Sequence, residues 1–209
     1  MIDLDEVSVS VGNVTLLAPL SATVDSGHVL VIRGRNGTGK STLLRTMAGV
    51  RTPTSGTVRI DDDIVTERDR RFRRRVAAMI GLPPIAPDLT VEDHMLLVAS
   101  TWLGDPRAAT RFSRGVLEEL GLTPLAARFP HELSSGQTQL LGLGLVLSRP
   151  FDVLIIDEPE QRLDPEHVDV VIGALRARRD SGATLVIATH SSRLAEELAD
   201  HTLWLSEAA

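Results

Sequence analysis

The sequence has no cysteine and no tyrosine, and only 3% of its residues are aromatic. Without cysteine the chain can form neither a disulfide nor a thiolate metal site, which suits a reducing compartment. Basic residues are also few, since 22 Lys and Arg stand against 28 Asp and Glu, giving a formal net charge of −6. A domain that binds nucleic acid normally carries the opposite charge, so we expect no nucleic acid partner.

Segments suited to a membrane are missing as well. The uncharged stretch Leu133–Ser148 contains Gln, Ser and Gly, and it is too short and too polar to span a bilayer. The N-terminal residues Met1–Glu6 are acidic, where a secretory leader would be basic and then apolar. We therefore expect a cytoplasmic chain with no direct membrane insertion, so that any role at a membrane requires a partner protein.

Strands and helices alternate along the 209 residues, which are enough for one well-buried domain. Apolar alternation and β-branched residues predict strands at Ile2–Val11, His28–Arg33, Thr57–Asp61, Val76–Ile80, Val153–Asp157, Thr184–Ala188 and Thr202–Leu205. Helices are predicted near Lys40–Gly49, Val91–Leu103, Pro106–Leu120, Ser135–Leu147, Pro165–Arg179 and Ser192–Ala199. This order predicts an α/β core (1–83 and 148–209) with a mostly parallel sheet flanked by helices, and residues 84–147 form a helical insert.

A glycine-rich segment follows the predicted strand His28–Arg33. It reads Gly34-Arg35-Asn36-Gly37-Thr38-Gly39-Lys40-Ser41-Thr42, a G-x-x-x-x-G-K-S pattern between a strand and a helix. Glycines let backbone N–H groups surround phosphates, and the positive end of the next helix favours a di- or triphosphate. In this pattern Lys40 reaches the β- and γ-phosphates and the Ser41 hydroxyl binds Mg²⁺. A plain glycine-rich turn is the alternative, and the lysine, the serine and the strand argue against it.

Two adjacent carboxylates stand at the end of the predicted strand Val153–Asp157: Asp157 is its last residue and Glu158 follows it. In open α/β folds nucleotides bind at the carboxyl ends of the strands. Asp157 is therefore a candidate to hold Mg²⁺ through a water molecule, and Glu158 is a candidate to polarise the attacking water as a general base. An Asp-Glu pair after a strand is by itself more often a loop cap, so the functional interpretation depends on the phosphate loop.

A further motif lies between the phosphate loop and the two carboxylates. It reads Leu133-Ser134-Ser135-Gly136-Gln137 and resembles the LSGGQ signature of the ATP-binding-cassette family. Pro159–Asp164 stands in the place of the D-loop, and Ile187–His190 matches the segment that carries the switch histidine. The resemblance runs from about Gly27 to His190, and the short helical insert and the single cassette are unlike the coiled-coil and twin-cassette members.

The resemblance implies a P-loop NTPase core with an N-terminal antiparallel β subdomain and an inserted helical subdomain. It implies that Lys40 and its loop bind the phosphates of ATP, that Ser41 and Asp157 bind Mg²⁺, that Glu158 is the catalytic carboxylate, and that His190 contacts the γ-phosphate. Ser134, Ser135, Gly136 and Gln137 would act in trans on ATP held by a second subunit, and Asp164 would link the two sites.

The resemblance also implies partners. A second ABC subunit, in a homodimer or heterodimer, would sandwich ATP, and a separately encoded transmembrane permease would hold the dimer at the inner face of the cell membrane. Two alternatives remain open: a soluble ABC ATPase that drives a non-membrane assembly process, and a regulatory cassette that binds ATP with weak hydrolysis.

Three positions depart from the family pattern. No aromatic residue precedes the phosphate loop, and Val11 stands about where the adenine-stacking ring of the family would fall. The glutamine of the Q-loop is missing, with Gly81 or Leu82 in its place. Ser135 replaces a glycine of the signature, which we interpret as tolerated.

Two biased stretches have simpler interpretations. The run Arg68–Arg75 invites a nucleic-acid or lipid role, although such runs are more often solvated helix faces. The run Leu140–Leu147 is interpreted as a buried helix that packs on the sheet, with its glycines allowing close approach.

Overall fold

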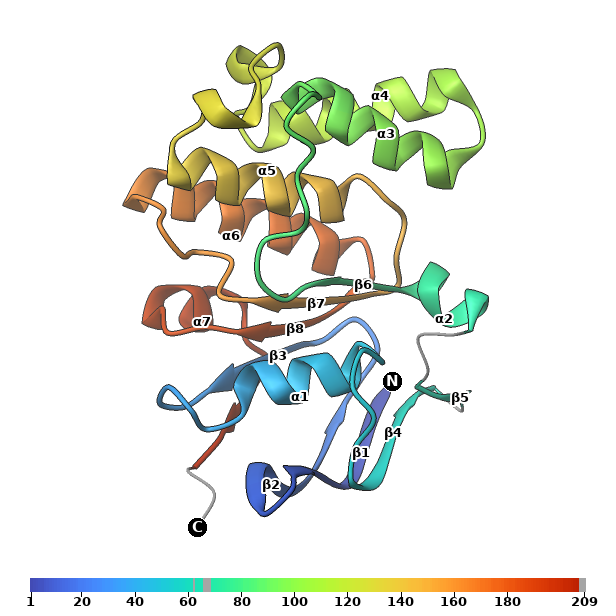
Figure 1. Cartoon of the computed structure of the whole chain (residues 1–209), viewed down its shortest axis with the longest axis vertical. Helices are drawn as coiled ribbons and strands as arrows, with labels where there is room; N and C mark the ends of the chain where they lie inside the picture. The colour runs from blue at the N-terminus through green and yellow to red at the C-terminus, as the bar shows by residue number, and fades with distance from the viewer. Residues whose placement is uncertain (62, 66–68, 207–209) are drawn as a thin grey trace. The chain divides into compact units, whose positions relative to one another are not determined.

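The sequence motifs of the sheet unit lie at the strand ends of a five-stranded parallel sheet. Its order is β6-β7-β8-β3-β9, formed by Val76–Met79, Val153–Asp157, Thr184–Ala188, Val29–Arg33 and His201–Trp204. Each neighbouring pair is parallel. The inner strands β3, β7 and β8 are buried along almost their whole length, as their continuous apolar sequences require. The predicted α/β fold with a mostly parallel sheet is confirmed (Figure 1).

The computed structural model describes residues 1–61, 63–65 and 69–206. They fall into two units. The sheet unit contains Met1–Ile80, Phe151–Glu158 and Ala177–Ala209, and the helical unit contains Gly81–Pro150 and Pro159–Arg176.

An antiparallel sheet precedes the parallel one in the sheet unit. Its order is β2-β1-β4-β5, formed by Val14–Val24, Ile2–Val11, Ser55–Ile60 and Asp63–Ile64. The predicted N-terminal antiparallel portion is therefore confirmed, but β2 and β5 were not predicted from the sequence. Pro19 interrupts β2 and hides its strand pattern, and the structure tolerates this proline because β2 lies at the edge of the sheet.

The described part of the sheet unit also contains the helices α1 (Lys40–Met47), α2 (Arg70–Arg75) and α7 (Ser192–Leu198), together with the last residues of α6 (Pro165–Asp180). Leu43, Leu44 and Met47 of α1 are fully buried in a hydrophobic core that also takes in side chains of both sheets. This packing fixes the start of α1, and with it the end of the glycine-rich loop, against the parallel sheet.

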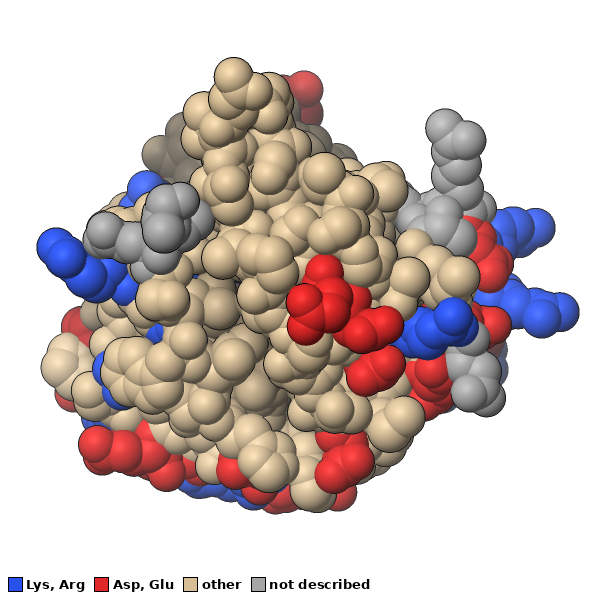
Figure 2. Space-filling view, turned by 90° about the horizontal axis from the view of Figure 1, so that it is seen from below, with Lys and Arg blue, Asp and Glu red and all other residues tan. Residues whose placement is uncertain are grey.

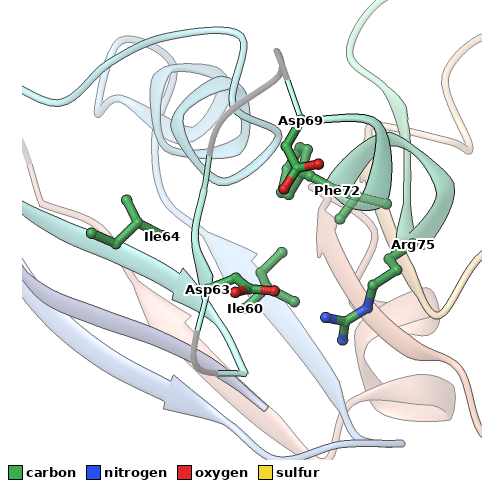
Figure 3. Close-up of a pocket in the computed structure, with 7 residues that line it drawn as sticks. Ile60, Asp63, Ile64, Asp69, Phe72 and Arg75 are labelled. Carbon is green, nitrogen blue, oxygen red and sulfur yellow. The ribbon is translucent and has the colours of Figure 1, made fainter.

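The arginine-rich run forms α2, apart from Arg68, which lies outside the described residues. None of the α2 residues is fully buried, and Arg70, Arg71, Arg73 and Arg74 form its solvated face. In Figure 2 blue side chains project beside red ones at the right-hand edge, the side where Figure 1 draws α2. Figure 3 shows Phe72 and Arg75 extending from α2 toward Ile60 and Asp63. The pocket between them holds only about 10 Å³, the lower limit for one water molecule.

Arg75 has a structural role there. Its guanidinium pairs with Asp61 and, at 3.1 Å, with Asp152, so it joins the ends of β4 and α2 to the start of β7. Hydrogen bonds from the N-terminal ammonium of Met1 and then from Arg75 lower the pKa of Asp61. Hydrogen bonding to Asp61 raises the pKa of Arg75 in turn.

The helical unit is built from α3 (Val91–Leu103), α4 (Pro106–Glu119), α5 (Ser135–Leu147) and most of α6 (Pro165–Asp180), with 3-10 turns η1 (Thr123–Leu125) and η2 (Pro130–Glu132). Thr90, Asp105 and Ser134 cap the helices that follow them, which explains where α3, α4 and α5 begin. Leu140–Leu147 are buried as predicted, and a Cβ on Gly144 would lie 3.0 Å from Met95 Cε. Among the described residues, no helix is both long and apolar enough to cross a membrane.

Candidate nucleotide-binding site

The glycine-rich loop connects β3 to α1 and encloses the Lys40 side chain. Lys40 is only 7% exposed, and its Nζ donates hydrogen bonds to the carbonyl oxygens of Gly34 (2.8 Å) and Arg35 (3.1 Å). The Thr38 hydroxyl donates to the same Arg35 carbonyl at 2.9 Å. A buried ammonium held by backbone carbonyls places a cation at the centre of the loop, where phosphate oxygens would bind.

Two of the loop's glycines are required by close contacts. A Cβ at Gly34 would lie 2.7 Å from both Leu205 O and Thr38 Oγ1. A Cβ at Gly39, whose φ is +94°, would lie 2.5 Å from Leu16 O of β2. Because no side chain fits at either place, the loop keeps its backbone close to its neighbours and its N–H groups accessible.

The Ser41 hydroxyl donates a hydrogen bond of 2.5 Å to Asp157 Oδ2 at the end of β7. This contact joins the two residues predicted to bind the metal, one from the start of α1 and one from a strand end. Both offer hard oxygen atoms, which Mg²⁺ prefers, and Mg²⁺ commonly takes one or two protein ligands and completes its shell with water and phosphate. The two residues therefore fit a magnesium ion bound together with a nucleotide.

Glu158 follows Asp157 and lies beside His190. Glu158 Oε1 is 3.3 Å from His190 Nε2, and the Glu158 N–H donates to Ala188 O at 2.8 Å. Glu158 has a φ of +47°, a conformation that non-glycine residues rarely adopt and that is associated with functional positions. The Glu158 and His190 side chains are 29% and 48% exposed, so both are accessible to a ligand.

One open pocket of about 520 Å³ combines the loop with the hairpin of the other sheet. It is lined by Val14, Thr15, Leu16, Asn36, Gly37, Gly39, Lys40, Ser41, Thr42 and Glu158. The β2 residues among them were missed by the sequence analysis, because β2 itself was not predicted. Val11, the position expected to replace the stacking ring, pairs with Val14 across the hairpin but does not line the pocket.

The signature residues lie in the helical unit, at the start of α5. Ser134 is the N-cap of α5, its Oγ accepts the Gln137 N–H at 3.2 Å, and the Gln137 side chain accepts the Ser134 N–H at 2.9 Å. Ser135 and Gly136 form the first turn, so the serine in the place of a glycine is accommodated in a regular helix. A Cβ at Gly136 would lie 2.9 Å from the carbonyl oxygen of Arg162.

Asp164 immediately precedes α6 in the same unit. Its Oδ1 accepts the backbone N–H of His167 at 2.9 Å and lies 2.8 Å from His167 Nδ1. Hydrogen bonding from the His167 backbone and side chain lowers the pKa of Asp164, so its carboxylate form is favoured. The described structure thus gives Asp164 a clear local role in starting the helix.

The segment in the place of the Q-loop is held to α3 by a buried histidine. The Ala86 N–H donates to His94 Nε2 at 3.0 Å, and His94 Nδ1 lies 2.7 Å from Thr90 O. Since Nε2 accepts, the other ring nitrogen must carry the proton and donate to Thr90. Gly81 has a φ of +83°, and Leu82 is 40% exposed, so the position of the missing glutamine presents an apolar side chain.

The fold and the site define a class of protein. A parallel sheet carries, at its strand ends, a lysine-centred phosphate loop, a hydroxyl–carboxylate pair and a Glu–His pair, which together characterise the P-loop nucleoside triphosphatases.

Comparison with known proteins narrows the class to a family. A family model described as "ABC transporter" matches residues 17–161. Arginine transport ATP-binding protein ArtM of Bacillus subtilis is 30% identical over 99% of this chain and 88% of its own length. Methionine import ATP-binding protein MetN 2 of Rhodococcus jostii is 34% identical over 95% of this chain and 60% of its own length. The chain therefore belongs to the ABC transporter family, and it is an ATP-hydrolysing cassette.

Solved structures agree in fold. An ATP-binding subunit of an ABC transporter superposes with a TM-score of 0.86 at 26% identity, covering 98% of this chain and 85% of that one. A dimeric cassette in a post-hydrolysis state, bound to ADP and Pi, superposes with a TM-score of 0.87 at 23% identity, covering 99% and 94%.

The close contact between Gly136 of the signature and the Arg162 carbonyl predicts that a methyl group added at Gly136 destabilises the fold. Gly136→Ala should lower the free energy of unfolding by about 1–3 kcal/mol, because the new Cβ displaces a backbone oxygen that has little freedom to move. Gly115→Ala is the matched control: it is also a helical glycine, but a Cβ there meets nothing within 4 Å, so the substitution should stabilise by about 0.5–1 kcal/mol. Urea unfolding of both variants measures the difference, and equal effects would contradict the packing described.

Proposed function

We propose that the chain is the ATP-binding and ATP-hydrolysing subunit of an ABC transporter, with Mg-ATP bound at the loop of the sheet unit. The observation that carries this proposal is the hydrogen bond of 2.5 Å between Ser41 and Asp157, which sets a metal-binding pair beside the buried Lys40. Bound Mg²⁺ would neutralise charge between the β- and γ-phosphates. Lys40 and the N–H groups of Gly34–Thr42 would hold the phosphate oxygens.

In the proposed hydrolysis, Glu158 and His190 have separate roles at the γ-phosphate. Glu158 orients a water molecule and accepts its proton as the water oxygen attacks the γ-phosphorus. The bond between the γ-phosphorus and the β–γ bridging oxygen breaks, and its electron pair leaves with ADP. His190, whose Nε2 lies 3.3 Å from Glu158 Oε1, would contact the γ-phosphate and hold the carboxylate in position. Catalysis is mainly positional and electrostatic.

A second cassette would complete the site. The start of α5, with Ser134, Ser135, Gly136 and Gln137, would cap the γ-phosphate of ATP bound to the partner copy, and Asp164 would connect the two sites. The positive end of a helix of 13 residues favours an anion there. ATP then stabilises the dimer by binding between the copies, and loss of phosphate weakens it. A dimeric cassette among the similar structures supports this arrangement.

A separately encoded permease is the proposed partner at the membrane. Relatives that align with nearly the whole chain are named as subunits for the transport of arginine and for the import of glutamate and aspartate. These names support transport of a small solute without assigning the substrate. The cassette would then lie on the cytoplasmic side of the membrane, attached through the permease.

The assignment of Glu158 predicts a separation of binding from turnover. Glu158→Gln should bind Mg-ATP with nearly wild-type affinity, lose at least about 100-fold in turnover because the base is gone, and form a dimer when ATP is present. Mg-dependent phosphate release and size-exclusion chromatography measure the two properties. Glu196→Gln, at an exposed glutamate on α7, is the control and should keep wild-type turnover. Hydrolysis by Glu158→Gln at the wild-type rate would show that another group is the base.

The pocket that contains Val14 predicts weak discrimination between adenine and guanine nucleotides. Because the pocket offers no aromatic ring to stack on the nucleobase, GTP should compete with ATP with an inhibition constant within about tenfold of the ATP affinity. A stacking contact of this kind is worth roughly 1–3 kcal/mol. Val14→Tyr should tighten ATP binding, whereas Val50→Tyr, an equally exposed valine outside the pocket, should not. Competition binding decides this, and a strong ATP preference in the unaltered chain would contradict it.

The proposed permease should copurify with this cassette. Tagged protein captured from gently solubilised membranes of its own cells should carry a polytopic membrane protein in near-equal amount. The Glu158→Gln variant, captured in parallel with ATP, tests whether the complex survives in the ATP-bound state. Recovery of soluble partners alone would favour the assembly ATPase, and recovery of none would favour the regulatory cassette.

A further inference from the structure

Arg162 adopts a backbone conformation that does not suit its side chain. The Leu163 N–H donates to Glu160 O at 3.2 Å and closes a turn of four residues in which Arg162 is the third. Its φ is +66°, the left-handed region in which this turn position favours glycine or asparagine. A long cationic side chain is therefore held here against the local preference.

The turn is fixed by its contact with α5. The Arg162 carbonyl oxygen occupies the space into which a Cβ on Gly136 would project, at 2.9 Å, and a Leu163 methyl group lies 3.5 Å from the same point. The Arg162 side chain itself is exposed, and it forms no hydrogen bond or ion pair with any residue that the structure describes. The contact thus sets the backbone of Arg162 beside the first turn of α5 and leaves its side chain exposed.

We propose that Arg162 is a further catalytic residue that acts in trans, contacting the γ-phosphate oxygens of a nucleoside triphosphate bound to a second copy of the chain. This inference rests on the proposed function, which brings the start of α5 to the partner's nucleotide. Because Arg162 packs against Gly136, whatever meets the start of α5 also comes within reach of its side chain. A guanidinium presents several donors in a rigid fork that matches phosphate oxygens, and it stays charged at neutral pH.

The charge balance of the dimer supports a cation at this place. Each copy carries a formal net charge of −6, so two copies repel each other, and a triphosphate between them adds further negative charge. Lys40 is enclosed by the loop of its own copy, which leaves the partner-facing oxygens of the phosphate to be neutralised from the other side. An exposed arginine supplied by the partner offsets that charge as it develops during hydrolysis.

Three variants of Arg162 separate the catalytic role from a structural one. Arg162→Gly relieves the backbone strain, so the melting temperature should rise by about 2–4 °C, while kcat should fall roughly 10- to 100-fold through loss of the charged contact. Arg162→Ala should lose the same activity without the gain in stability. Arg162→Lys should recover part of it, because the charge remains and the fork is lost. A purely structural residue would lower stability and activity together.

Binding measurements test the trans geometry. In dilute Arg162→Ala protein, where single copies predominate, the affinity for ATP should stay within about twofold of wild type, because the residue serves the other copy's site. In the Glu158→Gln background, the same change should weaken ATP-dependent dimerisation roughly 10- to 100-fold. Arg107→Ala, an exposed arginine on α4, is the matched control and should change neither property.

The outcomes distinguish this inference from the proposed function. Unaltered turnover and dimerisation of Arg162→Ala in an active wild-type background would overturn the inference alone. A loss of ATP affinity in the single copy would also overturn it, because the residue would then act in cis. A wild-type chain that neither hydrolyses Mg-ATP nor dimerises with it would overturn the proposed function and the inference together.

Discussion

The hydrogen bond between Ser41 and Asp157 is the contact on which the geometry of the nucleotide site depends. It joins the start of α1 to the end of β7 through two residues that are 116 positions apart in the sequence. Because β7, β8 and β3 are adjacent in a parallel sheet, their carboxyl ends meet at one edge, and the residues that follow them are brought together. Glu158 and His190 follow β7 and β8 in the same way, so the site is a consequence of strand order.

The buried lysine explains why this edge suits a polyphosphate. An ammonium group without partners is costly to bury, and the carbonyls of Gly34 and Arg35 offset that cost in the chain described here. The carbonyl oxygens carry partial negative charges, whereas a phosphate carries full negative charge. A nucleotide phosphate is therefore a stronger partner for the Lys40 ammonium, which is already buried before the nucleotide binds. The loop is thus held in shape before the ligand binds, which limits the entropy lost on binding.

The parts of this structure that the sequence predicted are those with local signals. The buried strands are continuous apolar runs, and the phosphate loop has a fixed spacing of glycine, lysine and serine, so both could be located without coordinates. Strand β2 could not, because Pro19 and mixed polarity hide its pattern and only pairing with β1 defines it. The contribution of Val14 to the pocket depends on the hairpin folding back until Leu16 O meets Gly39, a long-range contact that local sequence does not encode.

Backbone strain marks two of the residues to which chemistry is assigned. Glu158 and Arg162 have φ values of +47° and +66°, in a region that costs a residue with a side chain about 1–2 kcal/mol. Packing holds each one there: the Glu158 N–H is fixed to Ala188 O, and the Arg162 carbonyl is fixed against Gly136. Glu6 and Asp61 also have positive φ values, +47° and +53°, so a charged side chain in this conformation does not by itself mark a functional position. The roles proposed for Glu158 and Arg162 rest instead on the contact of Glu158 with His190 and on the packing of the Arg162 carbonyl against Gly136.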